Sequence, residues 1–230
     1  MTEREKTLLK AIVAEHIAQS RPIGSKIIVD KYLPDVSSAT IRNDMARLEE
    51  AGLIEQPHTS AGRVPTPKAY EYYVQNFLSK TQLDKSSRQK LEYVVKQHED
   101  FDRRIRELAK LVAELSSEAV VVGFSERDVY YTGLSNLFRQ PEFTTVDTVH
   151  DFTEIIDHLD DVMESIFPSV TPQIQILVGR NNPFGQSCGA IVTQYRCDGL
   201  TGMFGILGPM RMPYEKNSAL LQYASQIVSK

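Results

Sequence analysis

Apolar residues in the first third of the chain recur three or four positions apart, which is typical of amphipathic helices. This spacing predicts three helices, at about residues 2–19, 25–32 and 38–51. Thr2 and Glu5 fit a capping box, in which each side chain bonds an amide at the start of the first helix. Gly52 is the left-handed stop expected after the third helix.

The third predicted helix has two distinct sides. Ile41, Met45 and Leu48 recur at i, i+4 and i+7 and form its buried stripe. The opposite side is small and polar, and its residues are Ala39, Asn43 and Ala46, flanked by Thr40, Arg42 and Arg47.

A short hairpin follows, because Leu53–Gln56 and Arg63–Val64 can pair around a turn-rich loop. Thr66 and Pro67 then open a fourth helix that extends to about Ser79. Three helices followed by a hairpin predict a winged helix-turn-helix at residues 1–79. The alternative is a small helical bundle that carries a surface loop.

Residues 80–88 are polar and are predicted to be a linker. One long helix is expected from about Gln89 to Ser117, with apolar residues in a heptad pattern. The two seams of that pattern are Leu91, His98, Ile105 and Val112, and Val94, Phe101, Leu108 and Leu115. Four heptads can form a coiled coil, but Val95 and Leu111 widen the apolar face, which favours packing on a domain core.

The rest of the chain alternates strand-like and helix-like segments. A helix is expected at about residues 152–166 and another at 214–229. Strands are expected at five positions, which are 119–123, 129–134, 173–179, 189–195 and 200–207. We therefore predict an α+β class for the chain, with a mainly antiparallel sheet and packed helices in a second domain at residues 89–230.

Composition narrows the function classes further. The 230 residues carry a net charge of -4, yet residues 1–78 hold ten basic and ten acidic side chains. A neutral first domain can still present a local basic face to DNA. No apolar run is long enough to cross a bilayer, the N-terminus is charged, and the two cysteines form no Cys-x-x-Cys pair, which predicts a cytoplasmic protein.

Catalytic, cofactor and metal sites are not predicted. The nucleotide-binding, zinc-protease and serine-hydrolase motifs do not occur. Gly199, Gly202, Gly205 and Gly208 lie in strand-like sequence, so we interpret them as sites of close packing. Cys188 is expected to be a buried, inert thiol. The histidines and aspartates at residues 150–161 are better interpreted as a solvated helix face.

One constellation does fit a chemical task, the recognition of DNA. Hydroxyls at the start of the third helix can donate hydrogen bonds to a phosphate. Arg42 can pair with the edge of a guanine, and Asn43 can pair with the edge of an adenine. The loop of the hairpin can approach the backbone or the minor groove. The predicted DNA-binding residues are Ser37, Ser38, Thr40, Arg42, Asn43, Arg47, His58, Thr59, Ser60 and Arg63. For the hydroxyl residues, capping and turn formation is an equally good interpretation, and Arg42 can instead form a surface ion pair.

The segment Val36–Thr66, which contains these residues, closely resembles the signature of the HrcA family of heat-inducible transcription repressors. The resemblance continues at Tyr70–Val74, Ser135–Phe143, Ile176–Pro183 and Gly205–Tyr214. It implies a winged helix followed by a GAF-like domain. It also implies a dimer that binds an inverted-repeat operator, the CIRCE element, and a chaperonin that supports the repressor until heat stress occupies it.

The chain departs from the family pattern in length. Family members carry an inserted dimerisation domain, whereas here Val120–Phe124 is followed almost at once by Val129–Tyr131. Because an inverted repeat demands a two-fold partner, we expect the long helix and the GAF-like surface to supply the dimer contact. Two alternatives remain open: a regulator whose GAF-like domain senses a small molecule, and a protein-interaction module that binds no DNA.

Overall fold

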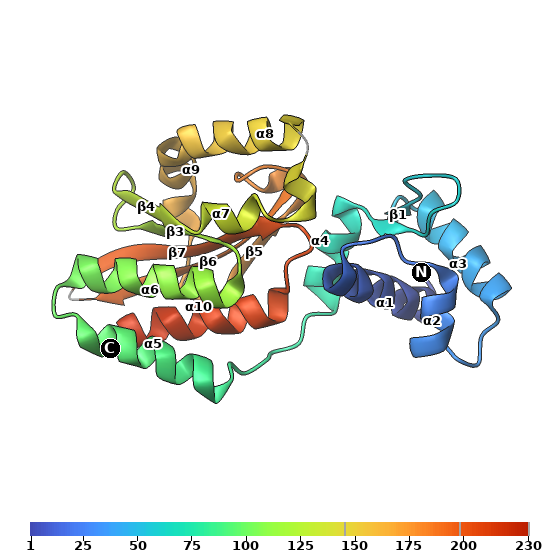
Figure 1. Cartoon of the computed structure of the whole chain (residues 1–230), viewed down its shortest axis with the longest axis horizontal. Coiled ribbons are helices and arrows are strands. Elements are labelled where there is room, and N and C mark those ends of the chain that lie inside the picture. Colours follow the sequence, from blue (N-terminus) through green and yellow to red (C-terminus); the bar gives the residue numbers. More distant parts are fainter. Residues whose placement is uncertain (145, 198, 230) are drawn as a thin grey trace. The chain divides into compact units, whose positions relative to one another are not determined.

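The computed structural model describes residues 1–144, 146–197 and 199–229, which form two compact units, Met1–Leu78 and Ser79–Lys230 (Figure 1). The first unit contains α1 (Glu3–Gln19), α2 (Ser25–Lys31), α3 (Ser38–Glu50), β1 (Ile54–Glu55), β2 (Val64–Pro65) and α4 (Pro67–Asn76). These bounds confirm the predicted helices and hairpin to within a few residues.

Capping and packing explain the first unit. Thr2 and Glu5 form the predicted capping box at the start of α1. The buried faces of α1 and α3 meet, and Leu8, Ile12 and Ile41 are fully buried. The hairpin is held to the segment before α2, because the backbones of Ile23 and Arg63 exchange two hydrogen bonds of 2.8 and 2.9 Å.

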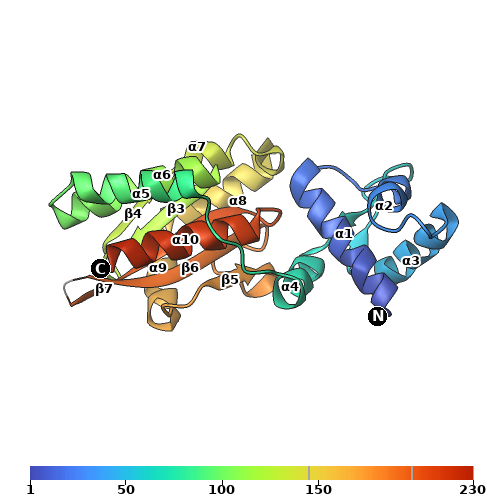
Figure 2. The same ribbon diagram turned by 90° about the horizontal axis from the view of Figure 1, so that it is seen from below.

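The second unit is a five-stranded antiparallel sheet with helices on both faces (Figures 1 and 2). The strand order is β4-β3-β7-β6-β5. The strands are β3 (Ala119–Gly123), β4 (Val129–Thr132), β5 (Gln175–Val178), β6 (Cys188–Cys197) and β7 (Leu200–Pro209). The helices α8 (Val146–Asp157) and α9 (Leu159–Ile166) lie on one face, and α6 (Phe101–Ser116) and α10 (Tyr214–Val228) lie on the other.

Five further elements of the described chain complete this unit. They are α5 (Lys85–Gln97), α7 (Leu134–Leu137) and the 3-10 turns η1 (Pro141–Thr144), η2 (Phe167–Ser169) and η3 (Gly179–Asn181). A tight turn joins β3 to β4, and there the Phe124 amide donates to the Asp128 carbonyl at 2.8 Å.

The prediction of one long helix at residues 89–117 is wrong. His98, a predicted seam residue, has an extended backbone after the end of α5, and α6 begins at Phe101. Asp100 caps α6 by accepting a 2.8 Å hydrogen bond from the Arg103 amide. The heptad residues are therefore divided between two helices that pack within one domain. In addition, α5 begins at Lys85, inside the predicted linker.

The helix predicted at residues 152–166 is also divided, at His158, into α8 and α9. Three of the four regularly spaced glycines, Gly202, Gly205 and Gly208, permit close packing, as predicted. The prediction is wrong for Gly199, because an added Cβ there would meet nothing within 4 Å and its φ of +79° is the left-handed conformation of a turn. A Cβ atom at Gly205 would lie 2.8 Å from Val121, and one at Gly208 would lie 2.5 Å from the Glu118 carboxylate. Within the described part of the chain, no helix is long and apolar enough to cross a membrane.

Candidate nucleic-acid interface

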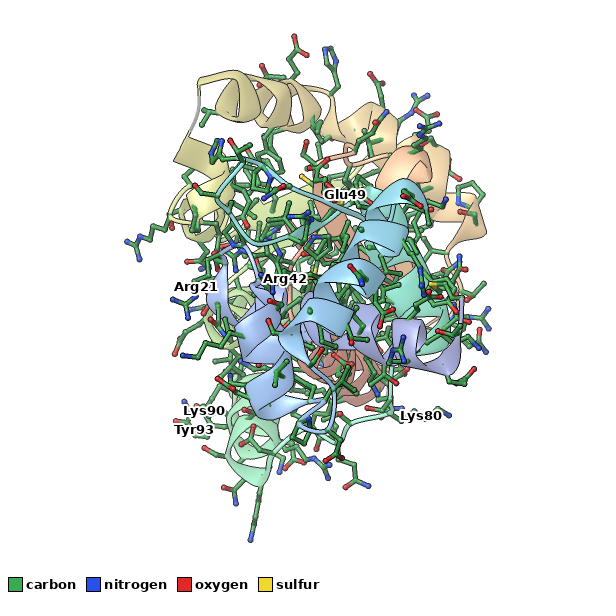
Figure 3. All side chains as sticks on the ribbon, turned by 90° about the vertical axis from the view of Figure 1, so that its right-hand side faces the viewer. Arg21, Arg42, Glu49, Lys80, Lys90 and Tyr93 are labelled. Carbon is green, nitrogen blue, oxygen red and sulfur yellow. The ribbon has the colours of Figure 1, made fainter. Side chains whose placement is uncertain are left out.

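The solvent-facing side of α3 is polar along its first half. Ala39, Arg42, Asn43 and Ala46 are exposed, whereas Ile41, Met45 and Leu48 are buried as predicted. Figure 3 shows Arg42 and Glu49 on the same helix, two turns apart. Neither the Arg42 nor the Asn43 side chain forms a hydrogen bond or ion pair with another described residue, so both are available to a ligand.

The hydroxyls at the start of α3 hold the helix-turn-helix together. The Ser37 hydroxyl oxygen accepts a 3.1 Å hydrogen bond from the Thr40 amide and lies 2.9 Å from the Thr40 hydroxyl. The Ser38 hydroxyl lies 2.8 Å from that of Ser25, on the first turn of α2. The Ser37 contacts agree with the interpretation of this serine as a helix cap. The Ser38–Ser25 contact places the beginnings of α2 and α3 side by side.

Arg47 is positioned by carboxylates. Its Nη1 lies 3.4 Å from Asp44 and 3.5 Å from Glu5, while its side chain is 60% exposed. The Asp44 carboxylate is 1% exposed and accepts a fork of hydrogen bonds from Arg4, at 2.6 and 3.0 Å. The remaining donors of Arg47 stay accessible, because Asp44 and Glu5 contact only Nη1.

The predicted wing is a closed loop with an exposed tip. The Gln56 amide group donates to the carbonyls of Thr59 and Ala61 at 3.0 and 2.9 Å, which shapes the loop. His58, Thr59 and Ser60 are exposed at its tip.

Arg63 stands at the base of the wing and is held by α3. Its guanidinium donates to Glu49 at 2.9 Å, and its side chain is only 20% exposed. The preceding glycine is required by the fold, because a Cβ at Gly62 would lie 2.5 Å from the backbone of Ile23. The structure therefore brings all ten predicted residues to α3 and the wing as exposed or half-exposed groups, and it pairs two of them, Arg47 and Arg63, with carboxylates.

Sequence reasoning missed the polar residues that support this surface. Asp44 falls inside the apolar stripe of α3, and a charged residue in such a stripe is a readable signal that a partner is required. Lys26, exposed on the first turn of α2 beside Ser25, is a further cation that the motif analysis passed over.

The second unit contains a cavity. About 560 Å³ lies between α8, α9 and the loop before β6. Its lining is mainly apolar. The lining residues are Phe143, Phe152, Ile155, Val162, Gly185 and Cys188, together with the polar Glu154, His158, Gln186 and Ser187. The Cys188 thiol is 3% exposed, and burial raises its pKa to about 12, which confirms a buried thiol that stays protonated.

Metal ligands do not gather among the described side chains, where no group of three or more histidine, cysteine or acidic residues is found. The side chains of His150 and Asp151, two of the residues considered above, lie outside the described set.

Comparison with known proteins connects both units to one group of regulators. The family model described as the HrcA protein C-terminal domain matches residues 66–217, and the DeoR-like helix-turn-helix model matches residues 13–66. The second match covers the end of α1, then α2, α3 and the whole hairpin.

Whole-length relatives bear the same family name. The heat-inducible transcription repressor HrcA of Carboxydothermus hydrogenoformans is 27% identical, with 99% of this chain and 97% of the relative covered. That alignment spans 335 positions, more than a hundred beyond the 230 residues of this chain. The HrcA of Caldanaerobacter subterraneus subsp. tengcongensis is 42% identical over 53% of this chain and 35% of the relative.

One solved structure shares the fold of the whole chain. The crystal structure of a hypothetical protein superimposes with a TM-score of 0.74 at 18% identity, and the match covers 100% of this chain and 96% of the other. A likeness at this level of identity supports the two-unit architecture alone.

Proposed function

This chain belongs to the HrcA family of heat-inducible transcription repressors, and from that premise we propose that it represses heat-shock genes by binding an inverted-repeat operator of the CIRCE type. It is a DNA-binding regulator and not an enzyme. The observation that carries the operator proposal is the exposed side of α3, where Arg42 and Asn43 are unengaged in a unit that matches a helix-turn-helix model.

In the proposed complex α3 lies in the major groove. Arg42 pairs with guanine and Asn43 with adenine, because their donors and acceptors match the edges of those bases. Arg47 and the hydroxyls of Ser37, Ser38 and Thr40 contact the phosphate backbone. His58, Thr59, Ser60 and Arg63 form the wing contact.

We also propose that two copies bind the repeat together. A single winged helix makes too few base contacts for high specificity, since each base pair contributes about 1–3 kcal/mol. An inverted repeat matches a protein with two-fold symmetry. In this proposal residues 1–79 form the DNA-binding domain, residues 80–84 the linker, and residues 85–230 the GAF-like regulatory and dimerisation domain, because α5 begins at Lys85 and not after the predicted linker at 80–88.

The proposed regulation of this repressor by heat and a chaperonin follows from the family. Heat inducibility is part of the relatives' name, and a chaperonin that supports the repressor until stress occupies it is the partner that the family implies. Such a repressor works in the cytoplasm, where bacterial DNA and chaperonins are found.

Anisotropy of a labelled inverted-repeat duplex, measured against a scrambled duplex across a salt series, tests the operator proposal. We expect tight binding on the repeat that survives added salt and a stoichiometry of two chains. Arg42→Ala should weaken binding to the repeat by roughly tenfold to a hundredfold, since one bidentate base contact is lost. Arg139→Ala, an equal change of charge at an exposed position of the other unit, should have little effect. Equal and salt-sensitive binding of both duplexes would contradict the proposal.

The 560 Å³ cavity favours one second candidate, a regulator that binds a small apolar molecule, because ligand pockets typically have this size and lining. Indole is a suitable probe. It should raise the melting temperature of the wild type and raise that of Val162→Trp less, because the added ring would occupy part of the cavity. The same melting shift in both proteins, or in neither, would rule this candidate out.

A further inference from the structure

The buried carboxylate of Asp44 joins the first and third helices of the DNA-binding unit. The Arg4 guanidinium of α1 donates to both of its oxygens, at 2.6 Å from Nε and 3.0 Å from Nη2. The Nη1 of Arg47 on α3 lies 3.4 Å from the same carboxylate. The Asp44 side chain is 1% exposed, whereas those of Arg4 and Arg47 are 44% and 60% exposed. One buried anion therefore holds two solvent-facing cations next to each other, and we call these two arginines the Arg4–Arg47 pair.

Stability alone does not explain an aspartate at this place in the apolar stripe of α3. The other members of the stripe, Ile41, Met45 and Leu48, are apolar and buried. Exchange of a buried ion pair for well-packed apolar side chains is often neutral or even stabilising, so packing does not require a carboxylate here. What the carboxylate supplies is a fixed point for two guanidinium groups. Its role is therefore the direction that it gives to the Arg4–Arg47 pair.

Both arginines keep donors that the network does not use. The Nη1 of Arg4 and the Nε and Nη2 of Arg47 form no hydrogen bond with any described residue. Guanidinium donors match the geometry of phosphate oxygens, and a side chain that is already held loses little entropy when it binds. With Asp44 and Glu5 beside it, the pair has no net charge. Any attraction to a phosphate must therefore come from the orientation of the free donors and not from bulk charge.

The pair stands at one edge of the exposed side of α3. Successive residues of a helix are turned by about 100°, so Arg47 and Glu49 are about 160° apart around the axis, with Arg42 and Asn43 between them. Glu49 holds Arg63 at the base of the wing. The exposed side is thus bordered by the wing at one edge and by the Arg4–Arg47 pair at the other. When such a helix lies in the major groove, groups at its edges face the phosphate backbone.

We propose that Asp44 is a positioning residue for DNA binding, which aims the Arg4–Arg47 pair at the phosphate backbone on the side of α3 away from the wing. This inference rests on the proposed function as an operator-binding repressor. It adds Arg4, on α1, as a phosphate contact outside the helix-turn-helix and the wing. It also gives a buried acid a role in binding although the acid itself touches no DNA.

Asp44→Asn in the full chain tests the proposal, because bulk charge and positioning predict opposite results. The variant removes a negative charge close to DNA, so charge alone would tighten binding. Loss of positioning should instead weaken binding to the repeat duplex, about threefold or more. The slope of log affinity against log salt concentration should become shallower by about one to two, since each phosphate contact contributes about 0.9. A lower folded fraction alone would leave this slope unchanged.

Glu50→Gln is the matched control. It makes the same chemical change on the same helix, at an exposed position where no described cation is held. This variant should bind the repeat at least as tightly as the wild type and keep its salt slope. Circular dichroism melting should show that both variants are fully folded at the temperature of the titration.

Arg4→Ala supplies a second, independent measurement. A phosphate contact carries no sequence information, so this variant should weaken binding to the repeat and to a scrambled duplex by a similar factor, up to about tenfold, and lower the salt slope by about one. Arg42→Ala, in contrast, should weaken binding to the repeat alone. In an Asp44→Asn background Arg4→Ala should have a smaller effect, because Arg4 has already lost its orientation.

The outcomes separate this inference from the function on which it rests. Selective binding by the wild type, with Asp44→Asn equally tight on the repeat and unchanged in slope, would overturn the positioning role and leave the proposed function standing. Equal effects of Arg4→Ala in the presence and absence of Asp44 would do the same. A wild type that does not distinguish the repeat from the scrambled duplex would overturn the proposed function, and the salt slopes of the variants would still decide whether Asp44 positions phosphate contacts.

Discussion

The two units treat buried carboxylates in opposite ways. In the first unit, Glu5, Glu15 and Asp44 are each at most 8% exposed, and each accepts hydrogen bonds from a nearby donor. In the second unit, Glu118 is 3% exposed and its Oε2 accepts no hydrogen bond from any described residue. The same chemical group therefore stabilises one fold as an anion and fits the other best as a neutral acid.

The pKa values follow from this difference. Burial raises the pKa of Glu118 to about 8, although the nearby cations Arg211 and Lys216 oppose the rise. For Glu15, burial also acts to raise the pKa, but hydrogen bonds from Lys31 and Tyr32 outweigh it and the pKa is lowered. The contribution of Glu15 to the first unit should consequently be lost as the pH falls, and that of Glu118 to the second unit as the pH rises.

The largest effect is expected at Glu118. The folded sheet keeps a proton that the unfolded chain releases above about pH 4.5, so stability falls as the pH rises to about 8. At about 1.4 kcal/mol per pH unit, the total loss is on the order of 3–5 kcal/mol. Glu118→Gln should remove this slope, and Glu126→Gln, at an exposed position, should keep it. Hydrogen exchange of the β3 and β7 amides from pH 5 to 9 measures the pH dependence of stability in this unit alone. An unchanged slope in Glu118→Gln would show that Glu118 is not its cause.

A smaller effect is expected at Asp44. Asp44→Asn removes a buried partner of Arg4 and should cost about 1–3 kcal/mol in the unfolding of the first unit. Asp35→Asn makes the same chemical change at an exposed site, where changes usually stay within about 0.5 kcal/mol. Urea unfolding followed at α1 and α3 by hydrogen exchange compares the two variants. Equal losses would show that the fork from Arg4 adds no stability.

The smallest effect is expected at Glu15. Because its pKa is lowered in the folded state, its contribution is present above its unfolded pKa and is lost as the pH falls through its folded pKa. Glu15→Gln should therefore flatten the acid limb of the stability profile of the first unit. If the wild type and Glu15→Gln lost stability equally as the pH falls, the role assigned to Glu15 in the first unit would be wrong.

Much of the fold was predictable from local signals. The hairpin and α1 to α4 follow from caps, a glycine stop and an apolar stripe, all of which act within a few residues. The break between α5 and α6 was missed because the heptad pattern continues across it, although the capping residue Asp100 marked the place. Competing local signals of this kind are decided by packing, which the sequence does not display.

The candidate site shows the same limit. The exposed side of α3 was predictable because it is the complement of Ile41, Met45 and Leu48. The pairing of Arg63 with Glu49 was not, since it depends on how the hairpin returns to the end of α3. The buried network of Asp44, Arg4 and Arg47 likewise joins residues up to 43 positions apart, a distance over which no periodicity gives information.

The tight turn between β3 and β4 has a consequence for how this fold can grow. The strands bring Phe124 and Asp128 within one hydrogen bond, so a segment inserted between them would leave the sheet and return at the same point. The free-energy cost of closing such a loop, which comes from lost chain entropy, rises by only about 0.6 kcal/mol for each doubling of its length. Lengthening the turn to a hundred residues would thus cost about 3 kcal/mol in loop closure, and an independently folded insert could offset that cost with its own core. Short and long proteins can therefore share this sheet with little thermodynamic difference between them.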